Sequence, residues 1–384
     1  MKKKIIFSLI IIALIGFGIF IKSYKEDYFL HGNSSEQMKE ENLLSMMLET
    51  SAESGEYEMV TQSSWPTDGY TFNAELSKCE NGGILGWDST NKVVTMTGSM
   101  SDKCYVYFDI AQQMTLAEYV ISQYDDVQGN NNIYYHNGTL TNGISDGSYR
   151  YSGASSAVNN YVCFGTDDET CPTENLYRII GVIGDKIKLI KATSLGEMVW
   201  DSAESNTWST SSLNTYLNGT YLDLFSETWK AKIVTTTWKV GGIDDIEVTA
   251  ATMYTNEMNS TATGTDGLTE YSSKVALMYV HDYGLAASPT AWGVNLYNYD
   301  GDDSNGTSIS TNDWLFIGSE DVEWLLSRIS SHSDFSYRVF SDGSIDSSNN
   351  YVSYSYVVRP VFFIESTATY SSGTGTDSDP IRIK

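Results

Sequence analysis

An apolar run close to the start of the chain constrains its architecture most. Residues 5–21 contain only apolar side chains, glycine and Ser8. As a helix these residues would extend about 26 Å, near the lower limit for crossing a bilayer. The lysines at positions 2–4 precede the run and favour a cytoplasmic amino terminus. We therefore expect residues 1–21 to form a transmembrane anchor of a single-pass protein of the cell membrane, with the body of the chain outside the cell.

A cleaved signal peptide is the alternative interpretation of the same run. Such a peptide usually has a shorter apolar region that ends in small residues at the cleavage site. Gly16 and Gly18 are small, but large apolar residues follow them directly. The sequence favours an uncleaved anchor and leaves cleavage open.

The charge and composition of the chain exclude several classes of protein. The formal net charge is −26 over 384 residues. A general nucleic-acid binder is excluded, because so acidic a protein would repel the phosphate backbone of a nucleic acid. Anionic lipid headgroups are poor partners for the same reason. A hydrophobic content of 41% with 27 tyrosines excludes global disorder. The length suggests two folded domains with connecting segments.

Four cysteines lie at positions 79, 104, 163 and 171. They form no Cys-x-x-Cys pair and have no histidine at a zinc-ligand spacing, which disfavours a zinc site. Outside a membrane they are expected to form two disulfides between sequence neighbours, Cys79–Cys104 and Cys163–Cys171. Four unpaired thiols remain the alternative.

Changes in sequence texture divide the chain into segments. Apolar residues crowd positions 43–48, which predicts a short helix in an acidic stalk, or a helix packed on the body. Thr115 and Glu118 form a capping-box pattern, which predicts a helix at about 115–124. The overall expectation is an α+β chain, rich in strands. Its segments are an anchor (1–21), a stalk with a short helix (22–56), a small β module (57–110), a linker helix and loop (111–146) and a large α+β surface domain (147–384).

The large domain resembles a family of uncharacterised bacterial cell-surface domains. The resemblance rests on YRIIGV at 177–182, on SLNTYLN at 212–218 and on VRPVF at 358–362, with a glycine- and threonine-rich coda at 372–380. It implies an extracellular α+β domain. The closing pattern of that family in turn resembles C-type-lectin-like domains, which is an analogy of fold and implies no function.

The resemblance and the hydrophobic periodicity disagree at residues 324–327. The acidic residues 319–321 followed by Val322, Leu325, Leu326 and Ile329 form a helical pattern. The family resemblance instead makes 324–327 a core strand. The sequence leaves both interpretations open.

Two clusters are candidates for chemistry. Asp300, Asp302, Asp303 and Asn305 offer the oxygen ligands that calcium prefers, although a solvated turn is the favoured explanation of this cluster. His281 beside Asp282 could act as a base, but the sequence identifies no nucleophile for it. We therefore assign no catalytic residue, and no cofactor apart from this weak calcium candidate.

Arg359 lies in an apolar stretch, so we expect it to be buried in an ion pair with an acid. A contact with a ligand is the alternative role for this side chain. The nine tryptophans and 27 tyrosines could supply a sugar-binding surface, but Trp208 and Trp314 lie at expected core positions.

These observations favour a membrane-anchored extracellular binding or adhesion protein whose ligand, a glycan or a protein, is unknown. A structural component of a cell-surface or pilus-like assembly is the alternative, and an envelope hydrolase is the least favoured of the three.

Overall fold

The computed structural model describes residues 44–384 except 62–63, 67–68, 99–101, 112, 246, 301–308, 319–320 and 347–349. The predicted anchor and residues 22–43 of the predicted stalk lie outside these residues. Within the described part, no helix has the length and apolarity needed to cross a membrane. The chain divides into a small unit that ends at Gln113 and a large unit, Met114–Lys384.

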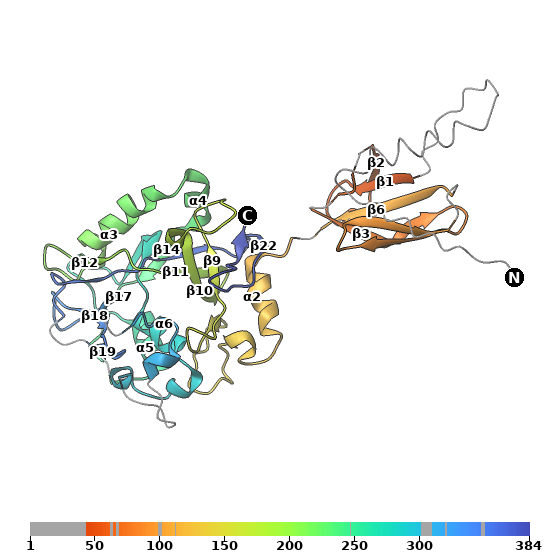
Figure 1. The fold of residues 1–384 in the computed structure, drawn as a ribbon. Coiled ribbons are helices and arrows are strands. Elements are labelled where there is room, and N and C mark those ends of the chain that lie inside the picture. Colours follow the sequence, from red (N-terminus) through yellow and green to blue (C-terminus); the bar gives the residue numbers. More distant parts are fainter. Residues whose placement is uncertain are drawn as a thin grey trace, which may run out of the picture. The chain divides into compact units, whose positions relative to one another are not determined.

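Strands build the described part of the small unit (Figure 1). Their bounds are β1 (Leu44–Glu49), β2 (Tyr57–Val60), β3 (Tyr70–Cys79), β4 (Ile84–Asp88), β5 (Val93–Thr97) and β6 (Cys104–Ile110). The sheet has the order β2-β1-β6-β3, in which β1 runs parallel to β6, and β4 pairs with β5 separately.

The core of the small unit is a compact set of apolar side chains. Met46 and Leu48 of β1 face Phe108 of β6, and the rings of Phe72 and Trp87 pack against the Phe108 ring. Cys79 and Cys104 are opposite each other in the β3–β6 ladder and form the predicted disulfide. That crosslink therefore joins the end of β3 to the start of β6.

The predicted helix at 43–48 is wrong in its described part, because Leu44–Glu49 is strand β1. Buried Met46 and Leu48 alternate with less buried Met47, which fits the two-residue period of a strand. Crowded apolar residues suit either period over so short a segment. Pairing with both β2 and β6 selects the strand, as tertiary context commonly does.

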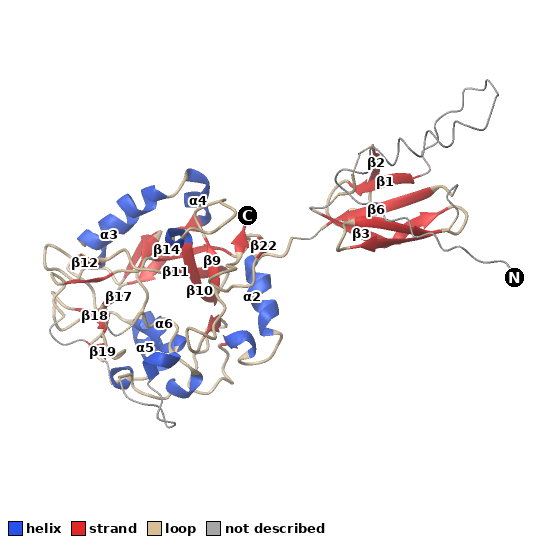
Figure 2. Cartoon of the chain, viewed as in Figure 1, coloured by secondary structure: helices blue, strands red, loops and turns tan. Residues whose placement is uncertain are grey.

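The large unit contains, among its described residues, an eight-stranded and a five-stranded sheet (Figure 2). The larger sheet has the order β13-β21-β11-β10-β8-β7, with β16 beside β21 and β9 beside β10. Its strands are β7 (Ile133–Tyr135), β8 (Tyr149–Tyr151), β9 (Tyr161–Cys163), β10 (Leu176–Ile183), β11 (Lys186–Lys191), β13 (Ile233–Val234), β16 (Val275–Ala276) and β21 (Val361–Glu365). Strands β10 and β11 form a hairpin, with Gly184 and Asp185 between them.

The smaller sheet has the order β12-β20-β17-β18-β19. Its strands are β12 (Glu197–Val199), β17 (Glu323–Arg328), β18 (Ser336–Val339), β19 (Ile345–Asp346) and β20 (Ser355–Val357). Residues 324–327 lie within strand β17, all of whose residues are buried. The strand interpretation of this segment is therefore correct and the helical one is wrong. Short ladders pair β14 (Thr236–Lys239) with β15 (Glu270–Ser273), and β22 (Tyr370–Ser372) with β23 (Arg382–Ile383).

The helices of the large unit are short. They are α2 (Leu116–Tyr124), α3 (Ser212–Tyr216), α4 (Glu227–Lys232), α5 (Ala250–Asn259) and α6 (Val280–Ala286). Helix α2 begins at the predicted capping box of Thr115 and Glu118. It is not part of a linker, because Leu116 and Val120 are fully buried in the core of the large unit and strand β7 follows within the predicted linker.

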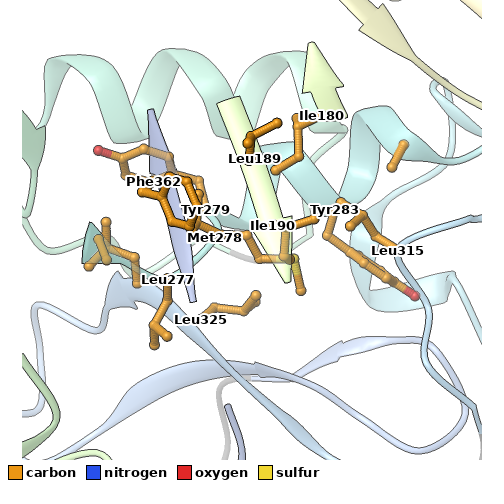
Figure 3. Close-up of a cluster of buried hydrophobic side chains, with 14 of the residues drawn as sticks. Ile180, Leu189, Ile190, Leu277, Met278, Tyr279, Tyr283, Leu315, Leu325 and Phe362 are labelled. Atoms are coloured by element: carbon orange, nitrogen blue, oxygen red, sulfur yellow. The ribbon is translucent and has the colours of Figure 1, made fainter. Parts of the chain in front are cut away.

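The core of the large unit joins its two sheets to α6. Figure 3 shows Ile180, Leu189, Ile190 and Phe362 of the larger sheet near Tyr279, Tyr283 and Leu325. Trp208 and Trp314 are also buried in this core, and Cys163 and Cys171 form the second predicted disulfide. The chain is therefore an α+β protein rich in strands, as the sequence predicted.

Candidate functional site

His281 and Asp282, the candidate base and its neighbour, both lie in α6, which follows strand β16. The Asp282 carboxylate accepts a hydrogen bond from the Tyr279 amide at 2.9 Å, which fixes the start of the helix. Gly284 permits close packing on α5, since a Cβ there would lie 2.7 Å from the Cβ of Ala250. Both residues of the predicted pair are therefore buried within the core.

Asp282 is the centre of a buried ionic network, formed by Arg150, Lys188, Glu257, His281 and Asp282. Its Oδ1 lies 3.0 Å from Nη1 of Arg150, and its Oδ2 is paired with the Lys188 ammonium. Burial alone would raise the pKa of Asp282, but Lys188, His281 and Arg150 together hold it well below the usual range. Asp282 is therefore a carboxylate shared between two buried cations.

Aromatic rings enclose the ammonium of Lys188. Its Nζ lies 4.7 Å from the ring centroid of Tyr279, with Phe363 and Trp238 at 5.5 and 5.7 Å. Burial lowers the pKa of Lys188, and the nearby Asp282 opposes that shift. Cation–π contacts and the Asp282 pair thus compensate the loss of water around this charge.

His281 faces Glu257 rather than a nucleophile. Its Nδ1 is hydrogen-bonded to Glu257, and the same carboxylate accepts a hydrogen bond from the Ser327 hydroxyl. In a Ser-His-acid triad the histidine must lie between the other two groups to take the serine proton. Here the carboxylate occupies that middle position and all three side chains are buried, so the arrangement suits a structural role.

His136 lies near the same network and has an incomplete set of partners. Its Nδ1 accepts a hydrogen bond from the Ile144 amide at 3.3 Å, while its Nε2 has no partner within the described part of the chain. Burial, and next the charge of Arg150, lower the pKa of His136 to about 3. This histidine is consequently neutral in the folded protein at physiological pH.

Arg359 is 2% exposed and forms a bidentate pair with Glu323 of β17. Its Nε and Nη2 each donate to a Glu323 oxygen at 2.7 Å, and Nη2 also donates to the Leu315 carbonyl at 2.6 Å. Burial raises the pKa of Glu323, and Arg359 opposes that shift. The acidic partner that the sequence required but did not identify is therefore Glu323.

The candidate calcium cluster falls mostly outside the described residues. Asp300 is exposed, and Asp302, Asp303 and Asn305 belong to the segment that the structure does not describe. Among the described residues, one group of potential metal ligands approaches closely: Cys79, Cys104 and Asp102. Its sulfurs are joined in the disulfide, and Asp102 accepts hydrogen bonds from the amides of Asn81 and Gly83. These contacts hold the loop that follows β3 against the start of β6.

An aromatic strip on the large unit was not predicted. It comprises His332, Phe335, Tyr351, Tyr354 and Tyr356. Successive ring centroids are 4.5, 4.6, 5.5 and 6.2 Å apart along this series. Tyr351 is 38% exposed and Tyr354 46% exposed, whereas Phe335 is buried beneath them. The strip thus presents tyrosine rings to solvent from a buried base.

Arg338 of β18 supports one end of the strip. Its guanidinium lies 5.1 Å from the Tyr356 ring centroid and donates a hydrogen bond to the Tyr356 hydroxyl. A second nitrogen pairs with Asp346 at 2.8 Å. The ring of Trp324 packs behind Tyr356, with the centroids 4.6 Å apart. These contacts fix Tyr356 against the five-stranded sheet.

The sequence contained a signal for this strip. Tyrosine, serine, asparagine and glycine make up 12 of the 16 residues at 341–356. This is the composition of antibody binding loops, in which tyrosine supplies contact area at low entropic cost and the small polar residues supply hydrogen bonds. Total tyrosine counts could not reveal it, because most aromatic side chains of the large unit pack inside its core.

Comparison with known proteins identifies one part of the chain. Residues 184–366 match the family model of a domain of unknown function, DUF6273. This stretch is similar to the DUF6273 family. The match confirms that the large unit contains an uncharacterised domain, and it includes both the ion pair of Arg359 and the aromatic strip. Neither the curated proteins nor the solved structures include a match to the chain.

Proposed function

We propose that this protein is an extracellular binding protein, held in the cell membrane by residues 5–21, that contacts its ligand through the aromatic strip. The observation that carries this proposal is the exposure of Tyr351 and Tyr354 next to buried Phe335. Contact residues that dominate binding are commonly tyrosine, tryptophan and arginine.

The two disulfides support the extracellular location. Cys79–Cys104 and Cys163–Cys171 leave none of the cysteines free. Disulfides of this structural kind persist in oxidising compartments and are rare in the cytosol. The apolar run and its flanking lysines supply the anchor in this proposal.

The rigidity of the domain beneath the strip supports a binding role. Exposed rings that are already held in place lose little freedom when a ligand binds, which leaves more of the contact energy for affinity. Phe335 and Trp324 are buried and pack against strip residues, and Arg338 fixes Tyr356. The ionic network and the Arg359–Glu323 pair then act as supports of the domain.

The proposal is tested with the full chain on an array that carries both glycans and extracellular proteins. We expect saturable binding that the double substitution Tyr351→Ala and Tyr354→Ala abolishes. Tyr297→Ala is the matched control, because Tyr297 is 49% exposed on the same unit and is not part of the strip. Binding that survives the double substitution would contradict the proposed surface.

The edge of the small unit favours a second function, a structural role in a surface assembly. Strand β2 pairs only with β1 in the described sheet, and its Met59 is 58% exposed. Unprotected edge strands are sites for pairing with another chain. Sedimentation of the full chain over a range of concentrations tests this function: self-association that Met59→Lys removes would support it, and a monomer throughout would contradict it.

A further inference from the structure

We propose that the ligand of the aromatic strip is a neutral polysaccharide chain. This inference rests on the proposed function and specifies the chemical class that the strip would recognise. Three properties of the strip point to this class: its narrow apolar surface, its polar groups and its charge.

The first property is that the apolar surface of the strip is narrow. Its rings follow one another in a single row, and neighbouring planes meet at 80°, 62° and 82° from Phe335 to Tyr356. In that row, Tyr351 and Tyr354 are the exposed large apolar side chains. Both side chains are less than half exposed, so the apolar surface that the strip offers to a ligand is small.

A row of rings fits a linear ligand better than a broad protein surface. Aromatic faces carry partial negative charge and attract the weakly positive C–H groups of a sugar ring. The planes of the Tyr351 and Tyr354 rings meet at 62°, so the two ring faces point in different directions. A flexible chain of sugar rings can place one ring against each tyrosine in turn.

The second property is the hydroxyl groups in this segment. Val352 and Ser353 lie between Tyr351 and Tyr354 in the sequence, and exposed Ser355 lies between Tyr354 and Tyr356. Hydroxyl groups both donate and accept hydrogen bonds, so they match the hydroxyl groups of a sugar without requiring a charge. A sugar offers C–H groups that can contact the aromatic rings and hydroxyl groups that can hydrogen-bond to the serines.

The third property is the charge around the strip. Arg338 is the cation beside it, but that side chain is only 9% exposed and is paired with Asp346. Asp342 is exposed and Asp334 is half-buried nearby in the sequence, and the whole chain carries a net charge of −26. Acidic polysaccharides and phosphates would meet repulsion with no exposed lysine or arginine in the strip to offset it. A neutral ligand avoids that cost.

Affinity electrophoresis of the full chain in detergent tests the inference. Native gels contain soluble β-glucan, xylan or galactomannan as neutral probes, and alginate as an acidic one. At least one neutral probe should retard the wild type and the Tyr297→Ala control equally. Tyr354→Ala should weaken that retardation by about tenfold, as expected for the loss of a central aromatic contact.

Three outcomes separate this inference from the proposed function. If array binding requires Tyr351 and Tyr354 but no neutral probe retards the protein, the ligand is not a neutral polysaccharide, and the proposed function stands. Retardation by alginate alone has the same meaning. If a neutral probe retards the wild type and the Tyr351→Ala and Tyr354→Ala variants alike, the strip is not the site, and both proposals fail.

Discussion

The small and large units stabilise buried acidic groups in different ways. In the small unit, buried Glu49 and Asp102 accept hydrogen bonds from backbone amides, such as those of Ile110 and Asn81. In the large unit, buried Asp201 also accepts hydrogen bonds from amides, but buried Asp282 and Glu323 are in addition paired with cations that come from distant parts of the chain. The difference follows from size, because the large unit has enough core to exclude water from complete ion pairs.

The comparison indicates where each unit is vulnerable. The described core of the small unit rests on six buried apolar residues and one crosslink that joins β3 to β6. A small core supplies little stabilisation, so the disulfide carries a large share of it. The large unit depends instead on buried charges, each of which is costly once its partner is lost.

The largest expected effect is on the ionic network. Asp282→Ala leaves the Lys188 ammonium buried without a carboxylate, whereas Arg150 keeps its pair with Asp146, so the large unit should lose about 3–5 kcal/mol of stability. Urea unfolding followed by tryptophan fluorescence measures this loss. Asp185→Ala is the matched control, because the Asp185–Lys186 pair is exposed and should contribute nothing measurable. Equal midpoints for the two variants would show that the network is not a support.

The disulfides should affect the two units unequally. The chain-entropy model predicts a loss of about 3.5 kcal/mol when Cys79 and Cys104 are both replaced by alanine, because the crosslink closes 25 residues. Replacing Cys163 and Cys171, which are 8 residues apart, should cost about 2.5 kcal/mol. Calorimetry of the full chain resolves the two transitions. A greater loss from the 163–171 pair would contradict the view that the small unit depends more on its crosslink.

A smaller effect should appear as acid sensitivity of the large unit. The pKa of His136 is lowered to about 3 in the folded state, against about 6.5 when unfolded. The unfolded chain therefore binds the proton more readily than the folded one. The contribution of His136 to the free energy of unfolding is fully present above pH 6.5 and is lost as the pH falls towards 3. At pH 5 the loss should be about 2 kcal/mol. His136→Gln should lack this component in urea unfolding at pH 7 and pH 5, and an unchanged pH dependence would exclude His136 as its source.

Local patterns predicted features that depend on residues close in sequence. The helix that begins at the capping box of Thr115 and both disulfides are examples. The helix predicted at 43–48 was wrong because its apolar residues fit both the helical and the strand period. Only pairing with the neighbouring strands β2 and β6 decides between the two.

The site was less predictable than the fold. The sequence required a carboxylate for Arg359, but nothing local indicated Glu323, which is 36 residues away. Likewise, Asp282 meets Arg150 and Lys188 only through the packing of α6 against β8 and β11. The composition of residues 341–356 was a local signal for the aromatic strip. The tyrosines of the strip differ from those of the core only in their exposure, however, and the sequence does not reveal exposure.

The most direct test of the account is the affinity of the Tyr354→Ala variant, measured together with its melting temperature. We infer that buried ion pairs stabilise the large unit, whereas the exposed aromatic strip binds the ligand. Tyr354 is 46% exposed, so its truncation should leave the melting temperature of the full chain unchanged while the affinity for the ligand found on the array falls by about tenfold. A variant that melts like the wild type and binds with the same affinity would contradict the central claim that the aromatic strip is the binding surface.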